Sequence, residues 1–180
     1  MQQPDAQMTA APLAEGALQE ALDTLHEQGF VILPEVLPEA WVTATRAAFT
    51  AELQAGHRDR ASQSGHGGFE PPLQAPFLDP RIIENTAVLQ VLERALGEHF
   101  FGCLPYGCNT AFPGSGVQNV HRDCGHLFPE LGQALPPMLI VVNILLDDFT
   151  AANGATEIWP RSHRQVDADQ AEISTLKISP

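Results

Sequence analysis

The chain has 180 residues, of which 44% are hydrophobic, so it is long enough for one domain with a sizeable core. Acidic residues outnumber basic residues by 22 to 9, and the formal net charge is −13. This balance argues against a nucleic acid or an anionic membrane as a partner, because both require a basic protein surface. It is compatible with a neutral or cationic small molecule as substrate.

The N-terminus and the cysteines indicate where the protein resides. The first residues are acidic and lack the charged-then-apolar pattern of a signal peptide, and no apolar run reaches the ~18 residues of a membrane span. The number of cysteines is odd, at three, which favours reduced thiols. We therefore predict a cytoplasmic protein with a disordered tail over residues 1–13 and one domain over residues 14–180.

The first half of the chain has helical periodicity. Leucines at helical spacing predict a helix over residues 15–28, which Gly29 ends. The apolar run over residues 30–33 predicts a short buried strand. A second helix is expected from Pro38 to just before Gly56, because proline is favoured in the first turn of a helix.

Two further regions complete the first half. Residues 56–76 lack periodicity and are predicted to form a long loop, which includes His57 and His66 and is a candidate lid. Asp79 followed by Pro80 is a helix-start signal, so a third helical region is expected to run to Gly97.

The second half has the pattern of short strands joined by turns. Strands are predicted over residues 117–123 and, most strongly, over residues 138–148. Residues 151–155 predict a turn, and residues 156–160 predict a returning strand. Helices followed by strands indicate an α+β fold that leads into a sandwich or a barrel.

The motif His121-Arg122-Asp123 can place two metal ligands together. Residues two apart in an extended strand point to the same side, so His121 and Asp123 converge while Arg122 faces away. We expect the side-chain tips of the pair about 3 to 4 Å apart, as for adjacent ligands of one metal ion. A third ligand from another strand would complete the two-histidine, one-carboxylate set of non-haem Fe(II). By itself the motif also fits a surface ion pair.

Three stretches, in order along the chain, resemble the phytanoyl-CoA dioxygenase family of Fe(II)/2-oxoglutarate oxygenases. They are EQGFVILPEVLPEAWVTATRAAF, QNVHRD and VNILLDDFTAANGATEIWPRSHR. They are spread over the chain from Glu27 to Arg164. Three ordered matches are far more specific than the short motif alone.

The resemblance implies a double-stranded β-helix, which is a jelly-roll or cupin-like barrel, behind N-terminal helices. It implies that His121 and Asp123 bind iron, that Asn143 lines the pocket of the cosubstrate 2-oxoglutarate, and that Gln118 contacts the cosubstrate or the substrate. A structural hydrogen bond is the alternative role for these two amides. The other implied cosubstrate is O₂, with ascorbate as an optional reductant. Asp123 also counts against a halogenase, in which the carboxylate ligand is absent.

Two other histidines in the second half of the chain are possible metal ligands. His163 belongs to the segment PRSH, which in the family is separate from the second iron-binding histidine. We therefore expect a structural or orienting role for His163. His126 lies in a loop with glycine and proline and is expected to be exposed to solvent.

The chain departs from the family after His163. The family's second histidine ligand and its 2-oxoglutarate-binding arginine have no matching position before Pro180. Either the chain is a fragment of a longer oxygenase, or it is a short form with an incomplete site. In both cases the last barrel strands are expected to be missing, and exposed edges favour a homo-oligomer. We expect little or no turnover by the chain alone.

The resulting hypothesis is an Fe(II)/2-oxoglutarate-dependent dioxygenase that hydroxylates a small organic molecule. Lys177 is the only lysine, so we expect a free small molecule rather than a CoA thioester, whose diphosphate requires basic residues. The alternative is a non-catalytic protein that uses the oxygenase fold for binding. Zinc bound by Cys103, Cys108 and Cys124 is disfavoured, because these residues lack the paired close spacing of zinc ligands.

Overall fold

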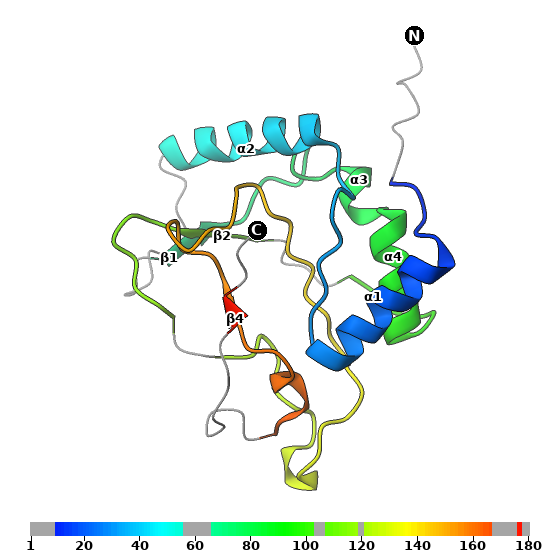
Figure 1. Ribbon diagram of the computed structural model, residues 1–180. Helices are drawn as coiled ribbons and strands as arrows, with labels where there is room; N and C mark the ends of the chain where they lie inside the picture. Colours follow the sequence, from blue (N-terminus) through cyan, green and yellow to red (C-terminus); the bar gives the residue numbers. More distant parts are fainter. Residues whose placement is uncertain (1–9, 56–65, 103–106, 119–120, 167–175, 178–180) are drawn as a thin grey trace.

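The computed structural model describes residues 10–55, 66–102, 107–118, 121–166 and 176–177 (Figure 1). Its helices are α1 (Glu15–Gln28), α2 (Glu39–Gln54), α3 (Pro80–Ile83) and α4 (Thr86–Leu96), with short 3-10 helices η1 (Pro129–Leu131) and η2 (Ser162–Arg164). Its strands are β1 (His66–Phe69), β2 (Cys108–Ala111), β3 (Glu157–Ile158) and β4 (Leu176–Lys177).

A small hydrophobic core joins α1 to α4, which lie side by side in Figure 1. Leu18 and Ala21 of α1 and Val91 of α4 form its buried centre. The partly buried side chains that pack around this centre are Leu13, Leu22, Leu25, Val31 and Leu33. The leucine spacing that predicted the helix over residues 15–28 is thus the spacing of its buried face, and that prediction is confirmed.

Two helix ends follow the signals in the sequence. Gly29 ends α1 with a left-handed φ of +88°, and its N–H donates to the Leu25 carbonyl at 2.9 Å. Helix α2 begins directly after Pro38 and ends at Gln54, as predicted. It buries the side chains of Trp41 and Thr45.

The third helical region consists of two helices, where one continuous region was predicted. Asp79 caps α3 as expected, because its side chain accepts a hydrogen bond from the Arg81 N–H. Asn85 then starts α4 by accepting from the Val88 N–H at 3.1 Å. Its side-chain amide also donates to the Val36 carbonyl at 2.9 Å, which fixes the break between the two helices.

Two predictions about the first half were wrong. Residues 30–33 are not a strand, although Val31 and Leu33 are partly buried and Ile32 between them is exposed. The predicted loop over residues 56–76 contains β1, which pairs antiparallel with β2. Residues 56–65, which include His57, lie outside the described part.

The predicted strands over residues 117–123 and 138–148 are also wrong for the residues that the structure describes. The second segment is apolar, yet Met138, Leu139, Val141 and Val142 are each 43–50% exposed. An extended apolar segment becomes a strand only when a neighbour pairs its backbone and covers its side chains. No described strand pairs with residues 138–148, so the segment remains irregular.

The last turn and strand were predicted more successfully. Residues 151–154 form a turn in which Gly154 has a φ of +82°. Strand β3 lies inside the predicted strand over residues 156–160, but its partner is β4. The expected helices are therefore present, whereas the described residues form two two-stranded sheets and no barrel.

Two further predictions concern the N-terminal boundary of the domain and membrane-spanning helices. The Leu13 N–H donates to the Gln90 side chain at 2.8 Å, while residues 1–9 lie outside the described part, so the boundary at residue 13 stays a prediction. None of the described helices has both the length and the hydropathy needed to cross a bilayer.

Candidate functional site

The structure brings together the two side chains that the sequence selected as metal ligands. His121 Nε2 and Asp123 Oδ1 lie 3.7 Å apart, inside the expected range of about 3 to 4 Å. The two side chains are 58% and 60% exposed, so the pair is open to solvent. The backbone at both residues is irregular, and their convergence does not come from a strand.

The pair fits part of an iron site. Two donors at right angles, each about 2.1 Å from one octahedral ion, lie about 3 Å apart, so a small closure from 3.7 Å is sufficient. A facial triad needs a third protein donor. Among the described residues, no group of three or more histidine, cysteine or acidic side chains is arranged to hold a metal ion.

His126 does not supply the third donor. The His126 ring is half-buried, and its Nε2 lies 3.2 Å from the Gln165 carbonyl oxygen. A carbonyl oxygen only accepts, so Nε2 is the donor and only Nδ1 keeps a lone pair. Among the described residues His126 does not form a group of three donors with His121 and Asp123. The expectation of a solvent-exposed His126 was wrong, because this contact anchors the ring to a segment far along the chain.

Arg122 faces away from the pair, as predicted. It is half-buried, and its Nη2 donates to the Ser162 carbonyl at 3.1 Å and to the Gln165 carbonyl. The sequence gave no indication of these acceptors, because backbone carbonyls are present at every position.

The expected structural role of His163 agrees with its contacts. The ring Nε2 lies 3.1 Å from the His26 carbonyl near the C-terminal end of α1, so Nε2 is the donor. Burial lowers the pKa of His163, which favours the neutral ring. The ring also lies directly against Gly29, where an added Cβ would be only 2.4 Å from His163 Nδ1.

The two residues expected to contact 2-oxoglutarate remain predictions. Gln118 and Asn143 both have exposed side chains. Gln118 is separated from His121 by residues 119–120, which lie outside the described part. Asn143 lies on the irregular apolar segment, where no strand fixes the direction of its side chain.

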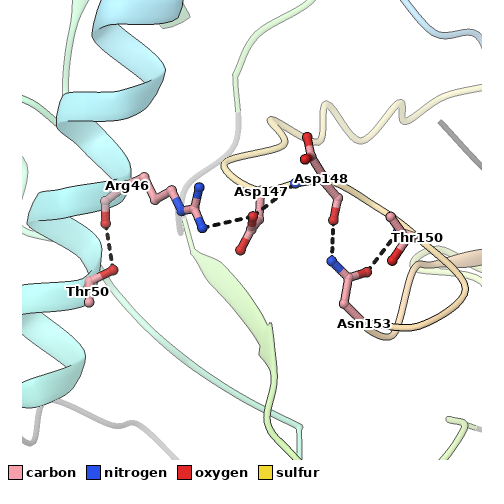
Figure 2. Close-up of polar contacts among 6 residues, drawn as sticks. All are labelled: Arg46, Thr50, Asp147, Asp148, Thr150 and Asn153. Atoms are coloured by element: carbon pink, nitrogen blue, oxygen red, sulfur yellow. Dashed lines mark hydrogen bonds and ion pairs between the residues drawn. The ribbon is translucent and has the colours of Figure 1, made fainter.

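The end of that segment is attached to α2 by an ion pair (Figure 2). Arg46 Nη2 lies 3.1 Å from Asp147 Oδ1, which also accepts from the Asp148 N–H at 3.0 Å. Asn153 accepts from the Thr150 N–H at 2.8 Å, and its amide donates to the Asp148 carbonyl. The contact of Asp147 with Arg46 has no local signal in the sequence, because the two residues are distant along the chain.

Sequence reasoning also missed a buried ion pair. Asp79, only 5% exposed, accepts from the Arg81 guanidinium through both carboxylate oxygens, at 2.7 and 2.6 Å. This hydrogen bonding lowers the pKa of Asp79 and outweighs the opposing effect of burial. The pair anchors the start of α3 and lies apart from the His121–Asp123 motif in the chain.

The cysteines provide no support for the zinc alternative. Cys108 and Cys124 are free and half-buried, and Cys103 lies outside the described part. Burial raises the pKa of Cys108 to about 11, so its thiol stays protonated at neutral pH.

Comparisons with known proteins agree with the resemblance in the sequence. The family model "Phytanoyl-CoA dioxygenase (PhyH)" matches residues 25–175. The chain is 33% identical over 101 residues to "Dioxygenase aneA" of Aspergillus aculeatus, an alignment that covers 52% of this chain and 33% of the relative. It is 28% identical over 167 residues to "Dioxygenase ALT11" of Alternaria alternata, which covers 82% of this chain and 55% of the relative.

Each alignment thus spans about half or less of the relative's own length. The names of both relatives support an oxygenase-type function. The family match covers most of the chain, including His121, Asp123 and the residues that contact α1. The chain belongs to the phytanoyl-CoA dioxygenase family.

Proposed function

We propose that this chain acts in an Fe(II)/2-oxoglutarate-dependent dioxygenase that hydroxylates a small organic molecule. The observation that carries the proposal is the 3.7 Å approach of His121 Nε2 to Asp123 Oδ1 within a family match that includes both residues. An imidazole nitrogen and a carboxylate oxygen are donors that suit non-haem Fe(II).

In this proposal His121 and Asp123 hold the iron, and Gln118 and Asn143 contact 2-oxoglutarate. The metal, once bound, supplies the redox chemistry that activates O₂, with ascorbate as an optional reductant. The chain's own residues orient the metal and leave coordination positions open. A third donor must come from outside the described residues, because none of them completes the set.

The substrate proposal follows from charge. A chain with 22 acidic and 9 basic residues offers few cations for the diphosphate of a CoA thioester. We propose a free neutral or cationic small molecule, which the acidic protein does not repel.

Metal binding by the 180-residue chain tests this function directly. Co(II) is a suitable probe, because its absorption spectrum reports the ligands and geometry of the site. We expect weak binding by wild type, because two protein ligands leave most coordination positions to water. His121→Ala and Asp123→Ala should each abolish it. His99→Ala is the matched control, because His99 is also exposed but lies outside the motif, and it should bind Co(II) as wild type does.

Co(II) binding that His121→Ala and Asp123→Ala leave unchanged would contradict the proposed site. A second measurement addresses the alternative of a non-catalytic binding protein, which the two-donor site favours. We expect little or no succinate release from 2-oxoglutarate by the chain alone with Fe(II) and ascorbate. Sustained release that disappears in His121→Ala would instead show that the chain is catalytically sufficient.

A further inference from the structure

Arg122 separates the two candidate ligands in sequence but contacts a different part of the molecule. Its guanidinium donates to the carbonyls of Ser162, at 3.1 Å, and Gln165. His126 donates to the same Gln165 carbonyl at 3.2 Å. Two side chains from the motif region therefore converge on the backbone of residues 162–165.

That backbone is itself fixed to the C-terminal end of α1. The Arg161 N–H donates to the Gln28 carbonyl at 2.8 Å, and its guanidinium lies 2.6 Å from Glu27 Oε1. His163 donates to the His26 carbonyl at 3.1 Å. Cationic and N–H donor groups are favourable here, because the last carbonyls of a helix carry partial negative charge.

The backbone at Arg161 shows how firmly this attachment is held. Arg161 has a φ of +66°, in the left-handed region that non-glycine residues rarely adopt. Such an unfavourable backbone conformation persists only where surrounding contacts hold it in place. The contacts of Arg161 with Glu27 and Gln28 provide that constraint, so residues 161–165 form a fixed support.

We propose that Arg122 is a positioning residue that holds residues 121–123 in the orientation in which His121 and Asp123 converge. Both hydrogen bonds come from the same Nη2 nitrogen, and together they restrict the position of the Arg122 side chain and of the backbone that carries it. His121 and Asp123 are the immediate neighbours of Arg122 in the chain, so fixing the backbone at Arg122 restricts the directions in which both side chains leave it. The metal-related part of this inference rests on the proposed function.

The contrast in burial agrees with this role. Arg122 is half-buried, whereas the side chains of His121 and Asp123 are 58% and 60% exposed. An exposed pair on irregular backbone needs an anchor elsewhere to keep its geometry. Arg122 supplies that anchor by connecting the pair to η2 and, through η2, to α1.

The test combines a metal-free and a metal-dependent measurement on the 180-residue chain. In amide hydrogen exchange without metal, Arg122→Ala should speed exchange over residues 121–126 and leave α1 and α4 unchanged. In Co(II) titration, it should weaken binding at least ~10-fold, as loss of an orienting partner does, and alter the Co(II) spectrum. Arg122→Lys should recover part of both effects, because its ammonium can donate to the same carbonyls but its side chain is shorter and more flexible.

Arg94→Ala is the matched control. Arg94 forms an ion pair with Glu15 at 3.6 Å, so it too contacts another part of the chain through its guanidinium. It lies on α4, away from the motif, so both measurements should match wild type. Circular dichroism confirms folding of each variant. If Arg122→Ala does not fold, Arg122→Lys decides the question with a smaller weakening of Co(II) binding.

The outcomes separate the two proposals. Wild-type exchange and wild-type Co(II) binding in a folded Arg122 variant would overturn the positioning role and leave the metal site standing. Co(II) binding that does not depend on His121 would overturn the proposed function, and exchange over residues 121–126 would then decide alone whether Arg122 orients the segment.

Discussion

The α1–α4 pair and the segment of residues 138–148 are both rich in apolar side chains, yet only the first is packed. Leu18 in α1 is 2% exposed, because α4 covers it, whereas Leu139 in the segment is 43% exposed. A helix satisfies its backbone hydrogen bonds within itself and needs a partner only for one face. A strand needs a neighbour for its backbone as well.

The difference shows what each kind of element requires from the rest of the protein. Helices α1 and α4 find their partners within the described residues, so their apolar faces are buried. The apolar segment finds no strand to pair with among those residues, and its side chains stay in contact with water. An apolar segment therefore indicates that a packing partner is needed, but it does not determine whether the rest of the chain provides one.

The largest expected effect comes from paired leucine truncations in the two regions. Leu18→Ala should lower the free energy of unfolding by about 2–5 kcal/mol, because it leaves a cavity in the core. Leu139→Ala, the matched control, should lower it by less than about 1 kcal/mol, because that side chain is already 43% exposed. Urea denaturation measures both changes.

Equal losses of unfolding free energy in the two variants would contradict the difference between the buried and the exposed leucine. They would mean that Leu139 is covered in solution, by another copy of the chain or by another partner. Repeating the measurement at several protein concentrations identifies self-association, because only then does the stability depend on concentration.

The next effect is pH-dependent stability at the start of α3. Asp79→Asn keeps a capping oxygen but loses the ion pair with Arg81, and should cost about 1–2 kcal/mol at pH 7. The folded pKa of Asp79 lies below its unfolded value of about 3.9. The stabilisation is therefore present above that unfolded value and is lost as pH falls through the folded pKa.

Urea denaturation of wild type and Asp79→Asn across a pH series measures this difference. The two free energies of unfolding should differ at pH 7 and approach each other in acid. A difference that stays constant down to the lowest pH would contradict an Asp79 that is ionised in the fold. Asp23→Asn is a control, because Asp23 is exposed and its contact is a hydrogen bond within α1.

The smallest effect concerns the ion pair that connects α2 to the segment of residues 138–148. Arg46 on α2 and Asp147 are 58% and 60% exposed, so a double-mutant cycle should give about 0.2–1 kcal/mol. Added salt should reduce this coupling, because exposed charges are screened. A coupling well above 1 kcal/mol that resists salt would show that the segment is held more firmly than its exposure indicates.

Local patterns in the sequence predicted the parts of the fold that depend on local contacts. The spacing of Leu18, Leu22 and Leu25 gave both the bounds of α1 and its buried face. The split between α3 and α4 was missed, because the Asn85 side chain that caps α4 also donates to the carbonyl of Val36, which is distant in the chain. The predicted strands failed for a similar reason, since their pairing partners are set by distant parts of the chain.

In the candidate site, too, a local feature was predictable and the long-range contacts were not. The predicted approach of His121 and Asp123 is confirmed at 3.7 Å, but the strand from which it was predicted is absent at these residues, and their role as iron ligands stays a prediction. The contacts of Arg122 and His126 with Gln165 were not predictable, because the acceptor is a backbone carbonyl with no signature in its side chain. Contacts between residues so far apart in the chain can be identified only from the three-dimensional structure.

Gly29 has a consequence for how freely this chain can change. Its φ of +88° excludes side chains for one reason, and His163 at 2.4 Å from an added Cβ excludes them for another. Shortening His163 would remove its ring, but the His163 Cβ would still lie 3.1 Å from the added atom and the left-handed φ would remain unfavourable. Two segments separated by most of the sequence are thus tied to one shared glycine, and any change at that position affects both.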